Sequence, residues 1–213
     1  MQVRATVTDR TTQLQRGRRL EYVTVFYNCI EGLIGIAAGL QAGSIALLGF
    51  GFDSAIEVTS GTALLWRLHR DDDPSRRESR ERLTLRIVGL CFVALAVYIG
   101  YDSISSLIRR EAPSRSLLGI GLAIASLVTM PLLARAKRAV ALAIGSAALN
   151  ADARQTDFCA YLSAILLGGL LLNALFGWWW ADPVSAIIMI PIIFREGVLA
   201  IRGKACCPDC ACV

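Results

Sequence analysis

The hydrophobic pattern of the chain consists of long apolar stretches separated by short polar segments. Six of these stretches are long enough to cross about 30 Å of hydrocarbon as α-helices. The pattern predicts an all-α membrane protein with a six-helix transmembrane bundle. The predicted spans cover residues 22–41, 45–65, 83–108, 117–134, 158–176 and 184–200.

A repeated motif leads into two of these spans, and each copy is followed by two polar residues four apart. The pentapeptide Gly-Ser-x-Ala-Leu occurs at residues 43–47 and again at 145–149. At the same distance from its own pentapeptide, the first copy is followed by Asp53 and Glu57 and the second by Gln155 and Cys159. Residues four apart share a face of a helix, so each helix is predicted to present two donor atoms on one face.

Asp53 and Glu57 lie near the middle of the second predicted span. Ionisable groups are expensive at that depth and face protein or water rather than lipid, which favours a functional site. Two acids four residues apart also repel each other when both are ionised, and a proton or a metal ion would relieve this repulsion. The alternative is a structural pair of acids that joins helices by hydrogen bonds.

The two pairs together offer three oxygen donors and one sulfur donor, because Gln155 supplies an amide oxygen and Cys159 a thiolate. This mixed set suits a borderline cation, with Zn²⁺ first, then Cd²⁺ or Co²⁺, and with Fe²⁺ and Mn²⁺ as further candidates. Buried cysteine is usually a small hydrophobic residue, so packing is the alternative for Cys159.

Other polar residues in the spans have two interpretations each. Asn28 and Glu31, three residues apart in the first span, either line an ion path or bond to a neighbouring helix. Asp152 could belong to the same path. We expect Arg154 and Asp157 to form a local ion pair on the fifth helix.

Two further groups are expected to be structural. Asp182, followed by Pro183, is predicted to be the N-cap of the sixth helix. Cys29 and Cys91 are expected to be packing residues, and His69, the only histidine, to be solvated.

Composition and charge support a membrane protein. Hydrophobic residues make up 55% of the chain, and its mean hydropathy is +0.54. Most Lys and Arg residues flank one side of the predicted bundle, while the other side has only Arg109, Arg110 and Arg115, so both termini are predicted to be cytoplasmic, in the plasma (inner) membrane. We interpret the net charge of +5 as topological charge and contact with anionic lipid of the bilayer, not as a nucleic-acid interface.

We divide the chain into a cytoplasmic N-terminal tail (1–19), a six-helix transmembrane domain (20–202) and a cysteine-rich cytoplasmic tail (203–213). Four cysteines in this last segment match soft-metal capture, although an S-acylated anchor or a disordered tail is the alternative. They are Cys206, Cys207, Cys210 and Cys212.

The two repeated segments, through Asp53-Ser54-x-x-Glu57 and Gln155-Thr156-x-x-Cys159, together with Ala181-Asp182-Pro183, resemble the transmembrane domain of the cation diffusion facilitator (cation efflux) family. The resemblance implies a six-helix protein, usually a homodimer, that exports divalent metal in exchange for protons by alternating access. It also implies a site at Asp53, Glu57, Gln155 and Cys159, with glutamine and cysteine in place of the family's histidine and aspartate on the fifth helix.

The leading functional prediction is therefore a proton-coupled exporter of Zn²⁺ or a similar ion. The alternative is a membrane metal-binding or accessory protein that does not transport and that captures metal with the cysteine-rich tail. We do not expect an enzyme, because the sequence shows neither a nucleophile with its base nor a phosphate-binding loop.

Overall fold

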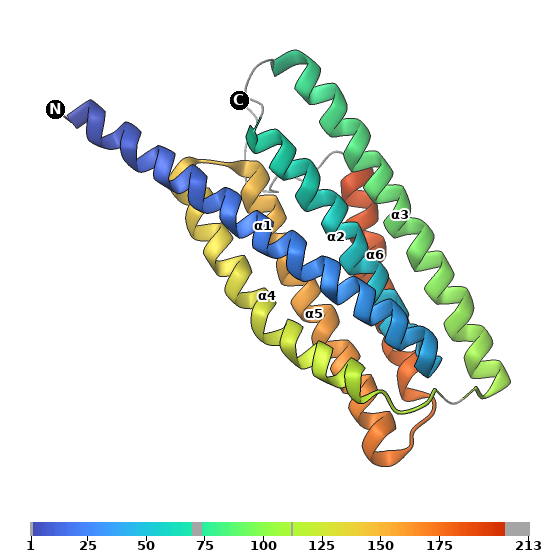
Figure 1. The fold of residues 1–213 in the computed structure, drawn as a ribbon. Helices are drawn as coiled ribbons and strands as arrows, with labels where there is room; N and C mark the ends of the chain where they lie inside the picture. Colours follow the sequence, from blue (N-terminus) through green and yellow to red (C-terminus); the bar gives the residue numbers. More distant parts are fainter. Residues whose placement is uncertain (1, 70–73, 112, 203–213) are drawn as a thin grey trace.

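A computed structural model describes residues 2–69, 74–111 and 113–202 and contains the six predicted helices. Successive helices run in opposite directions and lie together in one bundle (Figure 1). No β-strand occurs in these residues, which confirms the all-α prediction. The helices are α1 (Gln2–Ala42), α2 (Ile45–His69), α3 (Pro74–Arg109), α4 (Leu117–Ile144), α5 (Ala147–Phe176) and α6 (Ala181–Ile201).

Five of the helices are long and apolar enough to cross a membrane. Their apolar segments are Thr11–Ala42, Gly89–Arg109, Leu117–Ile144, Asp152–Phe176 and Ala181–Ile201. The remaining helix, α2, is 25 residues long, and its acidic and hydroxyl residues lower its hydropathy. It packs against α1, α3, α5 and α6, so much of its surface faces protein instead of lipid. The protein is a multi-pass integral membrane protein.

Three predicted helix boundaries were wrong. The first helix begins at Gln2 and not near Glu21, so the segment predicted as a polar tail is mostly helical. The fourth helix continues to Ile144, past its predicted span of residues 117–134, and the fifth begins at Ala147, well before its predicted apolar span of residues 158–176. Hydropathy ends a span at the first charged residues, but the helical hydrogen bonds continue where those charged side chains find partners in neighbouring helices.

The repeated pentapeptide forms a tight corner between two helices. Gly43 and Gly145 both have φ near 65°, the left-handed conformation that ends a helix and that glycine adopts at little cost. The next residue caps the following helix, because Ser44 Oγ accepts from the Leu47 N–H (3.1 Å) and Ser146 Oγ accepts from the Leu149 N–H (3.3 Å). The two corners lie at opposite ends of the bundle (Figure 1).

Asp182 caps α2 and not α6, contrary to the sequence prediction. Its carboxylate accepts from Ser44 Oγ (2.5 Å) and from the backbone N–H of Ile45 (2.8 Å). The N-cap position of α6 is occupied by Trp180, which makes no side-chain capping bond. Asp182 therefore joins the start of α6 to the start of α2, and this contact fixes the corner from which the acidic residues of α2 are positioned.

Replacing Asp182 with alanine should destabilise the bundle by about 2 kcal/mol, because it leaves the Ser44 hydroxyl and the Ile45 N–H buried without an acceptor. Thermal unfolding of the detergent-solubilised protein would measure this loss. Ser116→Ala is the matched control, since Ser116 caps α4 with a single bond to the Gly119 N–H and its loss should cost only about 1 kcal/mol. Equal stability of Asp182→Ala and wild type would contradict the capping role.

Helices α1 and α2 approach each other closely through glycines. A Cβ atom added at Gly51 would lie 2.7 Å from the Ile36 backbone nitrogen, and one added at Gly35 would lie 3.0 Å from the Gly51 Cα. Small residues that let backbones approach are a common basis of helix packing in membranes. This contact brings the polar residues of α1 next to those of α2.

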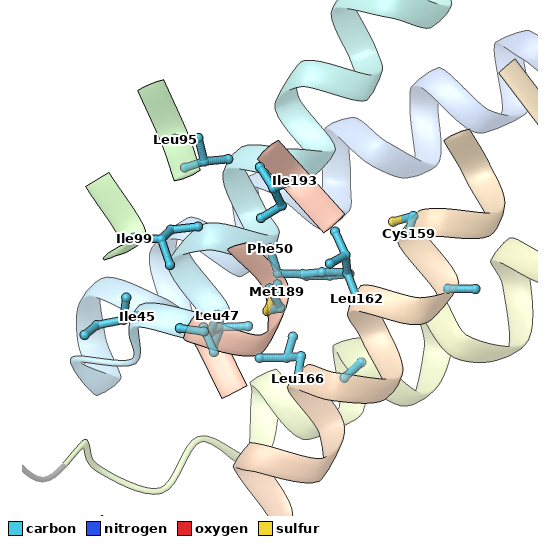
Figure 2. Packing of buried hydrophobic residues seen from close by; sticks show 14 of the residues in the cluster. Ile45, Leu47, Phe50, Leu95, Ile99, Cys159, Leu162, Leu166, Met189 and Ile193 are labelled. Carbon is cyan, nitrogen blue, oxygen red and sulfur yellow. The ribbon is translucent and has the colours of Figure 1, made fainter. Parts of the chain in front are cut away.

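The apolar core is formed mainly by α2, α3, α5 and α6, with further residues from α1 and α4, in the half of the bundle that contains the α1–α2 corner (Figure 2). Leu47, Phe50, Leu166 and Met189 are fully buried in it, and Leu162 is almost fully buried. Cys159 lies at the edge of this cluster, where the core meets the polar residues of the candidate site.

Candidate metal centre

The structure places the two predicted residue pairs on adjacent helices. We call Asp53 and Glu57 the α2 dyad, and Gln155 and Cys159 the α5 dyad. Asp53, Glu57 and Cys159 are buried, with exposed fractions of 5%, 6% and 1%, and Gln155 is half-buried. Ser60, one turn beyond Glu57, donates to Gln155 Oε1 at 3.3 Å. The two helices run in opposite directions, and this contact shows that the dyads lie at similar depth.

The four side chains do not form a closed metal cage in this conformation. Within the described part of the chain, no group of three or more His, Cys, Asp or Glu residues is arranged to hold a metal ion. The four-ligand set therefore stays a prediction. One residue of each dyad, Glu57 and Cys159, instead contacts a polar side chain of α1.

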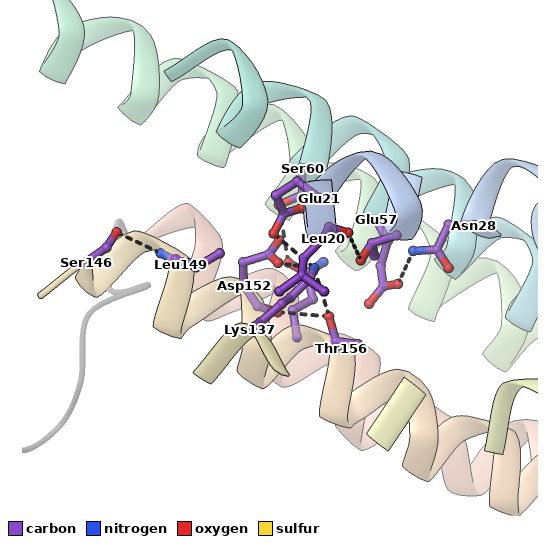
Figure 3. A network of polar contacts seen from close by, with 12 residues as sticks. Leu20, Glu21, Asn28, Glu57, Ser60, Lys137, Ser146, Leu149, Asp152 and Thr156 are labelled. Atoms are coloured by element: carbon purple, nitrogen blue, oxygen red, sulfur yellow. Dashed lines mark hydrogen bonds and ion pairs between the residues drawn. The ribbon is translucent and has the colours of Figure 1, made fainter. Parts of the chain in front are cut away.

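Asn28 and Glu31 of α1 each contact one of the dyads. Asn28 Nδ2 donates to Glu57 Oε2 at 2.6 Å (Figure 3). Glu31 Oε2 accepts from Ser54 Oγ at 2.9 Å and lies 3.8 Å from Cys159 Sγ. Both α1 residues have an exposed fraction of 1%. Sequence reasoning left their role open between an ion path and bonds to neighbouring helices, and the structure shows direct contacts with the residues of the candidate site.

Several buried polar atoms of this region have no hydrogen-bond partner in the described residues. They are Asn28 Oδ1, Glu31 Oε1, Gln155 Nε2 and the Tyr27 hydroxyl, which lies near Glu31. A buried polar atom without a partner costs free energy, and such atoms usually indicate a bound ligand, water or ion. The Asn28 and Glu31 atoms are oxygens that can bind a cation.

A second charged group surrounds Lys137, whose side chain is fully buried. Lys137 Nζ forms an ion pair with Glu21 at 3.1 Å and another with Asp152, and it donates to Thr156 Oγ1 at 3.4 Å. We call these four residues the Lys137 cluster. It joins α1, α4 and α5, and Glu57 lies next to it (Figure 3).

The Lys137 cluster was not expected from the sequence. Lys137 was assigned to the loop between the fourth and fifth spans, whereas it lies inside α4. Asp152, predicted as part of an ion path, is an ion-pair partner in this conformation. The cluster lies toward the end of the bundle that contains the α4–α5 corner, on the opposite side of the dyads from the apolar core (Figures 2 and 3).

Three smaller predictions also need correction or restriction. Asp157 pairs with Arg138 at 2.8 Å and not with Arg154. Cys29 and Cys91 are exposed on the bundle surface, so they are not core residues. The four cysteines of segment 203–213 lie outside the described residues.

Acidic side chains outnumber basic ones around the dyads. The described contacts place the basic group of Lys137 among these acidic side chains. Its single positive charge cannot neutralise all the carboxylates if they are ionised. A membrane interior does not tolerate such a surplus without bound protons or cations. The acidic residues are Glu21, Glu31, Asp53, Glu57 and Asp152.

Comparison with known proteins identifies relatives of this arrangement. The sequence profile of one protein family, described as the cation efflux transmembrane domain, matches residues 22–204. The match begins within α1 and extends past the end of α6. It therefore includes both dyads, both helix corners and the Lys137 cluster except Glu21, which directly precedes the matched range.

Two curated proteins are also similar to the chain. An uncharacterized transporter of Methanocaldococcus jannaschii is 28% identical over 179 residues, which are 81% of this chain and 63% of that protein. An uncharacterized transporter of Synechocystis sp. is 25% identical over 174 residues, which are 78% of this chain and 56% of that protein. The chain thus spans about three-fifths of the length of these relatives.

Proposed function

The chain belongs to the cation efflux family, and on this premise we propose that it exports a divalent metal cation from the cytoplasm, with Zn²⁺ as the preferred substrate. The observation that carries the proposal is the position of the two dyads, which lie at similar depth on adjacent antiparallel helices. The excess of acidic side chains around them supports a cationic substrate. Membrane acids that face the protein interior are typical of cation pathways.

The proposed site uses oxygen and sulfur donors from both helices. Asp53 and Glu57 supply carboxylates, Gln155 an amide oxygen and Cys159 a thiolate. A thiolate favours Zn²⁺, Cd²⁺ and Co²⁺, while the oxygen donors leave Fe²⁺ and Mn²⁺ as weaker candidates. The dyads would have to move closer together to enclose the ion, which fits a site that opens and closes by alternating access.

Proton exchange is the proposed driving force. Carboxyl groups removed from water hold protons more readily than exposed ones, and a metal ion must displace these protons when it binds. Release of metal on the other side would let the carboxylates take up protons again. The buried acids of the α2 dyad are the groups that would carry out this exchange.

The test is zinc flux in proteoliposomes with an imposed pH gradient. We expect Zn²⁺ to accumulate on the side from which protons leave, and to do so faster as the gradient increases. A Zn²⁺ flux that does not depend on the pH gradient would contradict proton coupling. A flux no greater than that of protein-free vesicles would contradict transport.

Deletion of residues 205–213 in the same assay tests the alternative in which the cysteine tail is the metal site. We expect the truncated protein to keep its Zn²⁺ flux.

Two further features belong to the same proposal. We propose that the protein acts as a homodimer in the plasma (inner) membrane, with both termini in the cytoplasm. The Lys and Arg residues are in excess at the end of the bundle where both termini lie, and this excess supports the orientation. In this orientation the Lys137 cluster lies between the dyads and the cytoplasm, and the apolar core lies between the dyads and the outside.

A further inference from the structure

We propose that Glu31 of α1 is itself a ligand of the transported cation, so that the site is shared by three helices, α1, α2 and α5. The inference deepens the proposed function and rests on it. Glu31 would supply a carboxylate oxygen on the side of Cys159, where the α5 dyad has none.

The position of Glu31 between the other two helices is the first argument. Its Oε2 atom contacts Ser54 of α2 at 2.9 Å and Cys159 Sγ of α5 at 3.8 Å, so the carboxylate lies between α2 and α5. Ser54 follows Asp53 directly in the chain. The glycine contact between α1 and α2 keeps the two helices close enough for this arrangement, because a Cβ atom at Gly32 would already lie 3.2 Å from the Gly51 carbonyl oxygen.

The second argument is the unused donor capacity at the same place. Glu31 Oε1 is buried and makes no hydrogen bond within the described residues, although the Tyr27 hydroxyl and Ser126 lie near this carboxylate, and Asn28 Oδ1, one turn away on α1, makes none either. A residue whose role was only to join helices would be expected to have both oxygens hydrogen-bonded, because a buried unpaired oxygen is costly. Two unpaired oxygens one turn apart on α1, on side chains that contact Glu57 and Cys159, are instead suited to a cation.

The third argument is that one ion can reach both Glu31 and Cys159. The two side chains already touch, so an ion bound to the sulfur lies within reach of the carboxylate after a small movement. On binding, the Cys159 S–H bond breaks, an S–metal bond forms, and the proton leaves to water. Glu31 then contributes negative charge next to the thiolate–metal bond, which favours a divalent ion over a monovalent one.

Cadmium binding to the full-length protein tests the inference, in a parent variant in which every cysteine except Cys159 is serine. Equilibrium dialysis gives the Cd²⁺ affinity, and the near-ultraviolet thiolate-to-cadmium charge-transfer band reports whether Cys159 Sγ is bound. We expect Glu31→Gln to weaken Cd²⁺ binding at least about 10-fold and to reduce the band. Asp102→Asn is the matched control, since it removes one carboxyl group from α3, away from the dyads, and should leave both readouts unchanged.

A rescue variant separates a ligand from a structural residue. Glu31→Cys replaces the carboxylate with a second thiolate, so if position 31 binds the ion this variant should bind Cd²⁺ more tightly than Glu31→Gln and increase the charge-transfer band above that of the parent. A purely structural role of Glu31 would give neither effect. If Glu31→Gln does not fold, Glu31→Asp keeps the charge but withdraws it by one methylene, and an unchanged affinity in that variant would overturn the inference.

The outcomes also separate this inference from the proposed function. Parent-like binding by Glu31→Gln, together with loss of binding by Asp53→Asn, would overturn the role of Glu31 and leave the proposed site in place. If the parent variant does not bind Cd²⁺, and the wild-type protein without residues 205–213 does not bind it either, both the role of Glu31 and the proposed function are overturned.

Discussion

Replacing Asp53 with alanine should abolish metal-dependent flux while leaving the protein folded. Removing a residue that only hydrogen-bonds to a metal ligand already lowers metal affinity about 10- to 100-fold. Removing a ligand itself should therefore reduce Zn²⁺ transport at least about 100-fold. Asp53 lies in the middle of α2 with an exposed fraction of 5%, and alanine is compatible with the helix there. Zinc uptake into proteoliposomes measures the effect.

The control for Asp53→Ala must remove a membrane carboxyl group without touching the site. Asp102→Asn on α3 does this, and we expect it to transport at the wild-type rate. Size-exclusion chromatography and circular dichroism would verify that both variants fold. Wild-type flux by a folded Asp53→Ala protein would exclude Asp53 as a ligand and would require another location for the ion.

Replacing Lys137 with methionine should destabilise the bundle by about 3–5 kcal/mol. Methionine fills a similar volume but leaves Glu21 and Asp152 without their buried cationic partner, and breaking a buried ion pair from one side is costly for this reason. Thermal or denaturant-induced unfolding in detergent measures the loss. The effect should exceed that of any single surface substitution on the same helix.

The next residue on α4 provides the control for Lys137. Arg138 pairs with Asp157, but their side chains are 42% and 26% exposed, so Arg138→Met should cost less than about 1 kcal/mol. Adding Glu21→Gln and Asp152→Asn to Lys137→Met removes the unpaired charges and should restore most of the stability. If the triple variant is no more stable than Lys137→Met, the loss does not come from unpaired charge.

The number of helices and the corner at residues 43–44 could be predicted because they depend on local sequence, and the same signal at residues 145–146 was missed. Apolar stretches of membrane-spanning length define the helices, and the Gly-Ser sequence at residues 43–44 and 145–146 defines two corners by the conformations that glycine and serine favour. The repeat also identified the dyads, since both follow their corner at the same distance along a regular helix. The structure places these dyads at similar depth.

Contacts between distant residues could not be predicted from one sequence. Asp182 caps a helix that begins 137 residues earlier in the chain, and its position before Pro183 suggested a local cap instead. Lys137 followed an apolar run and appeared to belong to a loop, because its partner Glu21 lies on another helix. The spacing of Asn28 and Glu31 placed them on one face of a helix. Their contact partners on α2 and α5 became clear only from the packing of the helices.

The two halves of the bundle differ in the side chains that fill them. On one side of the dyads the Lys137 cluster places charged groups in the interior, and a small apolar cluster of Leu64, Val140, Ala141 and Leu149 lies beyond it. On the other side Leu47, Phe50 and Leu166 are fully buried in the larger apolar core, and apolar constrictions of this kind exclude water unless the helices separate. In this conformation a cation at the dyads would therefore meet charged side chains in one direction and an apolar barrier in the other.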